Sequence, residues 1–242
     1  MDNFIYISGV FLIAGVVKGV TGMGLPTVAV ALLSLVMTPM QAAGLLIVPS
    51  LFTNIWQLFS GAPVYLLWER LRPMMLGICV GTLAGGLLLR NSGMATGTLG
   101  LALVAYALVG FSSLRWKVAV HDEHWLAPLA GAVTGMVSSA TGVFVLPAVP
   151  YLQALEMRKD DLVQAMGLAF TVSTMAMAVS LAMQGAWQPS MAGISFAAQL
   201  PALAGMLLGQ WMRKRLHPLV FRKCLLAVFL LTGAYLTLKS LS

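Results

Sequence analysis

The sequence predicts an all-α polytopic membrane protein built from two inverted repeats. Of its 242 residues, 60% are hydrophobic and only 9% are charged, whereas a soluble domain of this length carries about 25% charged residues. Long apolar runs recur along the whole chain, which argues against a soluble domain with a single anchor. Helices are expected, because runs such as 97–112 and 221–238 lack the two-residue alternation of barrel strands.

Charges and turn residues divide the chain into ten apolar segments. They cover about 3–20, 25–37, 41–60, 73–90 and 97–112, then 125–139, 143–155, 161–183, 190–212 and 219–238. A polar connector at 113–124 separates a first transmembrane repeat, 1–112, from a second, 125–242. The N-terminal residues are not basic, so a cleaved signal peptide is not expected.

The two halves match in an ordered series, which predicts a duplication. QAAGL at 41–45 returns as QAMGL at 164–168, and Gly81-x-x-x-Gly85 returns as Gly205-x-x-x-Gly209. Three residues of the first half recur 120 positions later, and a proline recurs close by: Gly15, Thr21 and Gly22 as Gly135, Thr141 and Gly142, and Pro26 as Pro147.

The basic residues of the loops predict how the halves are oriented. Segments 25–37 and 143–155 hold about a dozen residues each, fewer than the roughly 20 that cross a bilayer. If each first pair of segments is a hairpin that returns to the side it entered, the loops carrying Arg70, Lys117, Arg158 and Arg213 share one side, in line with the positive-inside rule. Three full spans after each hairpin then give the repeats opposite orientations, which is typical of transporters that bind substrate at the repeat interface.

The stretch KGVTGMGLP, at 18–26, places helix breakers and a charge inside the first apolar run. A break here exposes N–H groups at the start of the next helix, and such a terminus attracts anions. The second copy, SSATGVFVLP at 138–147, has hydroxyls but no lysine, so the two hairpins predict a lopsided, donor-rich anion cavity at the midplane. The expected substrate contacts are Lys18, Gly19, Thr21, Gly22, Gly24, Ser138, Ser139, Thr141 and Gly142, with Pro26 and Pro147 as helix breaks or gates.

Structural explanations of the same residues stay open at this point. Glycine-rich breaks in membrane helices are often packing contacts, and a lysine such as Lys18 can snorkel towards the interface. Serine and threonine hydroxyls usually bond their own backbone. The GxxxG pairs predict close helix contacts, either within the bundle or between the subunits of a homodimer.

A second polar cluster lies on the segments that follow the hairpins. Asn54 and Gln57 are three residues apart and therefore share a helix face, and the matching segment carries Thr171 and Thr174. An amide in hydrocarbon needs hydrogen-bond partners. For each of these residues the sequence favours equally a contact to substrate and a bond between helices.

The absent residue types exclude several functions. No Asp or Glu lies deep in an apolar segment, and His121, His124 and His217 all lie in loops. The carboxylates of cation pumps, a metal-ligand set, a Ser-His-Asp arrangement and a phosphate loop are therefore missing, and neither an enzyme nor a cofactor is expected. The net charge of +7 is spread over short clusters between apolar runs, which indicates loops facing anionic lipid and not a nucleic-acid surface.

Three stretches resemble the sulfite exporter TauE/SafE family: GVVKGVTGMGLPTVAV at 15–30, QAAGL followed by Asn54, and TGMVSSATGVFVLPAVPYL at 134–152. The resemblance covers essentially the whole chain. It implies a multi-pass protein of the bacterial inner membrane that moves anions such as sulfite, sulfoacetate or aryl sulfonates. The chain departs from the family at Val143-Phe144, where the second turn commonly has a Gly-Gly pair.

These features together predict a secondary carrier that exports a small sulfur anion by alternating access. A channel for anions or small solutes, and a non-transporting subunit of a membrane complex, are the alternatives. Coupling to a proton, coupling to a sodium ion and uncoupled movement fit the sequence equally.

Overall fold

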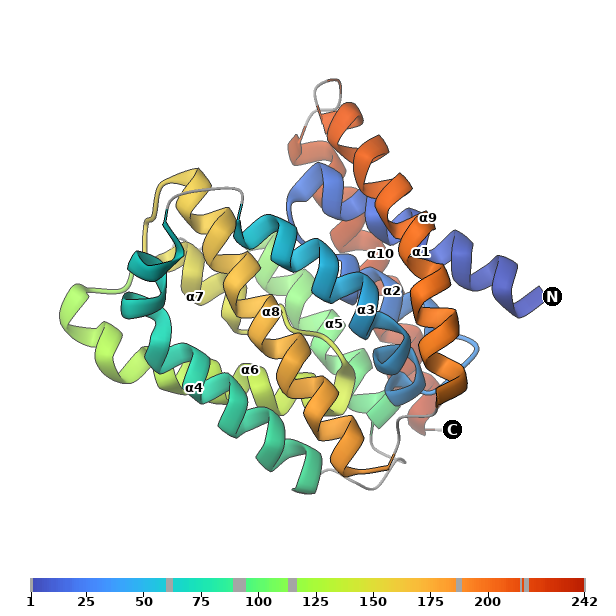
Figure 1. The fold of residues 1–242 in the computed structure, drawn as a ribbon, viewed down its shortest axis with the longest axis horizontal. Coiled ribbons are helices and arrows are strands. Elements are labelled where there is room, and N and C mark those ends of the chain that lie inside the picture. Colours follow the sequence, from blue (N-terminus) through green and yellow to red (C-terminus); the bar gives the residue numbers. More distant parts are fainter. Residues whose placement is uncertain are drawn as a thin grey trace.

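The computed structural model describes residues 2–59, 63–88, 95–112, 117–185, 189–213, 215 and 218–241, and these residues form ten α-helices (Figure 1). The predicted loop residue His217 and the start of the connector lie outside the described residues. The helices are α1 (Asp2–Thr21), α2 (Leu25–Leu33), α3 (Pro39–Leu58), α4 (Val64–Leu88), α5 (Ala95–Phe111), α6 (Glu123–Thr141), α7 (Ala148–Ala154), α8 (Lys159–Met183), α9 (Pro189–Arg213) and α10 (Pro218–Leu241). The all-helical class and the ten predicted segments are thus confirmed.

Local sequence explains where several helices begin and end. Thr38 caps α3, since its hydroxyl accepts from the backbone of Gln41 while the Gln41 amide accepts from the backbone of Thr38. Gly24 precedes α2 with a φ of 96°, a conformation that favours glycine. The predicted start of the fourth segment at 73 is wrong, because α4 begins at Val64 and includes Arg70, whose charge is satisfied outside the bundle by Glu123.

The helix pairs are related by an exchange of the two halves. The main pairs are α1 with α9, α4 with α6, α3 with α8 and α5 with α10, supported by α3 with α9 and α4 with α8. The counterpart of each helix of the first half is the one five places further along the chain, so that α1 corresponds to α6 and α4 to α9. When every helix is replaced by its counterpart, the same set of contacting pairs results. The counterparts α5 and α10 run antiparallel, since Gly97 lies against Ser240 at one end and Gly110 against Leu226 at the other.

Glycines allow the first helix of each half to pack closely on the fourth helix of the other half. A Cβ added at Gly205 would lie 2.1 Å from the backbone oxygen of Leu12, and one added at Gly81 would lie 2.1 Å from that of Ala132. The prediction that the GxxxG pairs are close helix contacts is therefore confirmed, and helices of the same chain cover these faces. A homodimer stays a prediction.

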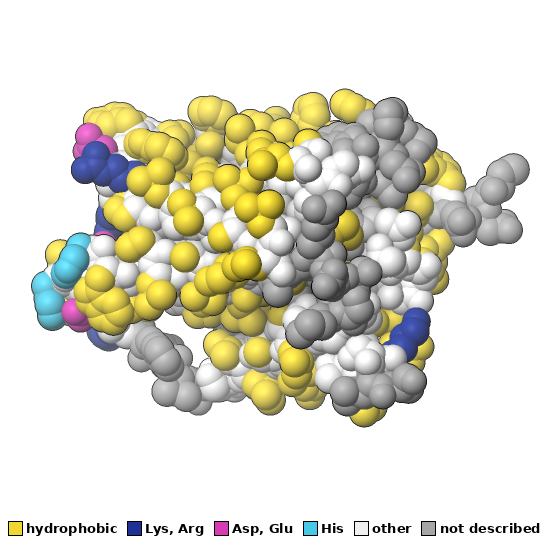
Figure 2. All heavy atoms as spheres, turned by 90° about the horizontal axis from the view of Figure 1, so that it is seen from below, with side chains coloured by type: hydrophobic (Ala, Val, Ile, Leu, Met, Phe, Trp, Pro, Cys, Tyr) yellow, Lys and Arg dark blue, Asp and Glu magenta, His cyan; other side chains and the backbone are white. Residues whose placement is uncertain are grey.

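Charged side chains gather at one end of the molecule. Arg70 at the start of α4 pairs with Glu123 at the start of α6 at 2.6 Å, and Lys117 pairs with Glu156 at 2.8 Å. The first part of α4, which carries Arg70, thus lies against the start of α6, and Lys117 lies against the connection between α7 and α8, which also carries Arg158. Figure 2 shows most of the charged side chains of one face at this end and hydrophobic side chains over the rest.

Four helices in the described part of the chain are long and apolar enough to cross a membrane. They contain Phe4–Thr21, Val64–Leu88, Lys159–Met183 and Lys223–Ser240, and the shorter apolar stretch Thr96–Phe111 accompanies them. The helices α2 and α7, with nine and seven residues, are too short to cross.

Candidate anion-binding site

The glycine-rich turn after α1 forms as predicted. The helix ends at Thr21, and both Gly22 and Gly24 adopt positive φ values, 79° and 96°. The Thr21 hydroxyl donates to the Val17 carbonyl and accepts from the Met23 backbone N–H. Thr21 is therefore a cap of the turn, and the structure gives it no hydrogen bond towards Lys18.

The turn after α6 repeats this geometry. Gly142 has a φ of 71°, and its N–H donates to the backbone carbonyl of Ser138, just as the Gly22 N–H donates to the backbone carbonyl of Lys18. Thr141 caps its turn as Thr21 does, bonding Val137 and the backbone of Val143. Pro26 lies in the first turn of α2, and Pro147 immediately precedes α7, so both prolines mark helix starts, as predicted breaks should.

Lys18 forms the centre of a buried polar cluster that joins three helices. Its ammonium group donates to the Asn54 side-chain oxygen and, at 3.0 Å, to the Thr53 hydroxyl, both on α3. The Asn54 amide in turn lies 3.5 Å from the Thr174 hydroxyl of α8. Lys18 is 4% exposed and Asn54 is fully buried, so the cluster is closed to solvent in this conformation.

Thr53 is an acceptor for Lys18 because its own hydrogen is used elsewhere. Its hydroxyl donates to the Pro49 carbonyl at 2.7 Å, which leaves the lone pairs directed at the ammonium group. Thr53 is not among the site residues that the sequence predicts. The signal was available, since Thr53 is next to Asn54 and four residues after Pro49, at the spacing of a hydroxyl-to-backbone bond within a helix.

Among the described residues, no carboxylate forms an ion pair or hydrogen bond with Lys18. The seven acidic residues of the chain lie at its N-terminus, at the start of α4 or in the segment 122–161. An ammonium group has three donors, and the described residues accept from only two of those of Lys18. A buried cation without a counter-charge is costly, so the cluster is suited to an anion that supplies the missing charge.

The structure separates the two hairpin turns, so the predicted shared cavity is wrong. Gly22 lies nearest to Val163 at the start of α8, whereas Gly142 packs against Ala43 near the start of α3 and against Val30. The cause is helix length: α1 has 20 residues and α6 has 19, so each is about 30 Å long and carries its turn well past the middle of the bundle.

Other predicted site residues have structural partners away from Lys18. Gly19 faces the backbone of α9, where an added Cβ would lie 2.3 Å from the Met206 oxygen. Ser138 lies 3.5 Å from the Thr82 hydroxyl, and Ser139 bonds Met136 and packs against Gly85. The Thr171 hydroxyl donates within its own helix to Gly167. Among the predicted residues, Lys18, Asn54 and Thr174 are therefore the ones joined by hydrogen bonds between their described side chains.

Gln57 joins α3 to α8 at the charged end of the pair. Its amide donates to the Val163 carbonyl at 2.7 Å, and Gln164 donates back to the Leu58 carbonyl at 2.8 Å. Of the two roles left open for Gln57 by the sequence, a bond between helices is therefore the one seen here.

Replacing Gln57 by leucine is expected to lower the free energy of unfolding by about 1 kcal/mol, the usual contribution of one hydrogen bond, and to leave anion affinity within about twofold. Thermal unfolding in detergent, with and without anion, measures both quantities. The matched variant Gln164→Leu, which removes the reciprocal bond, should behave alike. A large loss of affinity in Gln57→Leu alone would instead make Gln57 a substrate contact.

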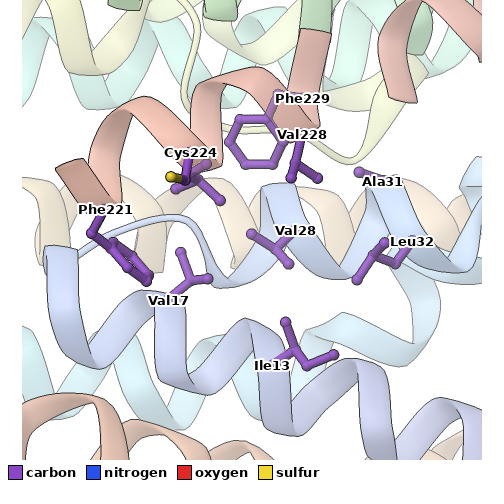
Figure 3. Close-up of a pocket in the computed structure, with 10 residues that line it drawn as sticks. Ile13, Val17, Val28, Ala31, Leu32, Phe221, Cys224, Val228 and Phe229 are labelled. Carbon is purple, nitrogen blue, oxygen red and sulfur yellow. The ribbon is translucent and has the colours of Figure 1, made fainter. Parts of the chain in front are cut away.

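An apolar groove of about 220 Å³ borders the first hairpin on its other side. Figure 3 shows Val17 and Val28 of the hairpin opposite Cys224 and Phe229 of α10. Its lining residues are all nonpolar, so this groove has no donors for an anion.

Comparison with known proteins gives one match. The family model described as "Sulfite exporter TauE/SafE" matches residues 7–236, nearly the whole chain. Searches of curated proteins and of solved structures found no match.

Proposed function

The chain belongs to the sulfite exporter TauE/SafE family, and we propose that it is a secondary carrier that exports a small sulfur oxyanion or organosulfonate across the bacterial inner membrane. The observation that carries the proposal is Lys18, a buried cation with an unused donor and no acidic partner. The Lys18–Thr53–Asn54–Thr174 cluster would bind the anion, and the family supplies the sulfur chemistry of the substrate.

The fold supports alternating access between two inverted repeats. Helix pairing is preserved when the halves are exchanged, and the counterparts α5 and α10 run antiparallel, as expected of halves with opposite orientations. Lys18 comes from the first hairpin, Asn54 from α3 and Thr174 from the second repeat. Rocking one repeat against the other would therefore open the cluster to one side at a time, and the apolar groove beside α10 leaves space for the hairpin to move.

Flux measurements in liposomes test the function directly. We expect the purified chain alone to take up radiolabelled sulfite with saturable kinetics, and unlabelled sulfite or methanesulfonate trapped inside to accelerate this uptake. Such exchange is the property of a carrier. Flux that rises linearly with concentration and shows no acceleration would indicate a channel, and an absence of both flux and anion-induced stabilisation would leave the chain as a subunit of a larger complex.

A further inference from the structure

Two serines in the centre of the bundle have buried hydroxyls without hydrogen-bond partners. Ser50 of α3 and Ser173 of α8 are both fully buried, and neither hydroxyl has a partner in the described part of the chain. Leaving a buried hydroxyl unpaired is unfavourable, because the group loses its hydrogen bonds to water. Serine in a helix can avoid this by bonding its own backbone, as Thr53 and Thr174 do one turn or less away. The hydroxyls of Ser50 and Ser173 are therefore available to donate to a bound group.

Ser50 and Ser173 occupy equivalent positions in the two halves. The Gln residues that open QAAGL and QAMGL are 41 and 164, and the separation between them is the same as that between Ser50 and Ser173. The two helices pack against each other, with Asn54 of α3 bonded to Thr174 of α8. The two serines thus occupy corresponding positions on α3 and α8, the two helices through which the halves contact each other here.

Ser50 is one helical turn from the Lys18 cluster, and Ser173 lies on the helix that supplies Thr174 to that cluster. Ser50 lies one turn before Asn54 and therefore on the same face of α3, and the Thr53 hydroxyl lies 3.2 Å from the Ser50 carbonyl. Ser173 directly precedes Thr174. Lys18, Ser50 and Ser173 thus each hold an unused donor, on α1, α3 and α8 respectively.

We propose that Ser50 and Ser173 complete the anion site, donating with Lys18 to an anion whose head group has three equivalent oxygens, such as sulfite or a sulfonate. This inference rests on the carrier function proposed above. Three donors on three helices match three acceptor oxygens on one sulfur atom. Because the donors come from both repeats, a bound anion connects the two repeats. A halide has no separate oxygen atoms to accept from the three donors, so it is expected to bind more weakly than sulfite.

The variants Ser50→Ala and Ser173→Ala test the inference. Each is expected to weaken binding of sulfite and methanesulfonate about tenfold or more, since hydrogen bonds to charged groups contribute about 1.5–3 kcal/mol. The melting temperature without anion is expected to stay the same or to rise, because an unpaired buried hydroxyl is removed. Dissociation constants from anion-dependent thermal shifts give both readouts.

Ser34→Ala is the matched control, since the Ser34 hydroxyl is also buried and unpaired but lies at the end of α2, away from Lys18. It should bind anions like the wild type. If wild type binds both anions, Lys18→Met does not, and the two serine variants bind normally, only this inference is overturned. If wild type binds neither anion, the proposed function itself fails. A fall in the anion-free melting temperature without a change in affinity would show that the serines are structural.

Discussion

Replacing Lys18 by methionine is expected to weaken anion binding at least about a hundredfold and to stop transport. A charge pair at 4 Å contributes about 4 kcal/mol at the effective dielectric constant of a protein, and the variant also loses a charge-assisted hydrogen bond. Methionine has a similar length and fills the same space, so the packing of α1 against α3 should survive. The measurement is the anion-dependent shift in melting temperature, followed by uptake in liposomes.

The same variant is expected to be more stable than the wild type in the absence of anion. Lys18 has no acidic partner, and the Thr53 and Asn54 oxygens compensate its buried charge only in part. Lys223→Met, at an exposed lysine at the start of α10, is the control for loss of one positive charge and should change neither property. Normal sulfite affinity in Lys18→Met would remove Lys18 from the site and, with it, the main support for the proposed carrier.

Much of this fold follows from the sequence because lipid leaves few choices. Ten apolar segments are expected to be helices, because the backbone must satisfy its own hydrogen bonds in lipid. Gly22, Gly24 and Gly142 are expected to interrupt helices, and in the structure these glycines adopt left-handed conformations at the turns. The contact between Lys18 and Asn54 could not be predicted from the sequence alone. Each was identified separately as a polar residue in hydrocarbon, and only the packing of α1 on α3 brings them together.

The depth of the hairpins could not be read from segment boundaries alone. The sequence analysis placed both turns at the midplane, but α1 and α6 are each long enough to cross most of a bilayer, so their turns lie near opposite ends of the α3–α8 pair. The direction in which each residue of a helix faces could not be predicted from the sequence either. Gly19 and Ser139 belong to the glycine-rich motifs, yet both face a neighbouring helix, whereas Lys18, one residue before Gly19, faces the polar cluster.

Adding a methyl group at Gly15 or Gly135 is expected to destabilise the bundle strongly. In Gly15→Ala the new Cβ would lie 2.2 Å from the Ala202 oxygen, and in Gly135→Ala it would lie 2.4 Å from the Ile78 oxygen. Backbone cannot yield as a side chain can, so each pair of helices must separate. Overpacking of this kind costs about 1–3 kcal/mol, or a fall in melting temperature of roughly 2–10 °C for a chain of this size.

Gly9→Ala is the matched control, because nothing lies within 4 Å of the added Cβ and alanine favours the helix. It should leave the melting temperature unchanged or raise it. Light scattering on the same samples distinguishes a helix contact within one chain from a contact between the subunits of a dimer. If Gly15 and Gly135 held a dimer together, their variants would dissociate without losing stability as monomers. We expect the reverse, lower stability at an unchanged mass, because these glycines pack the first helix of each half against the fourth helix of the other half within one chain.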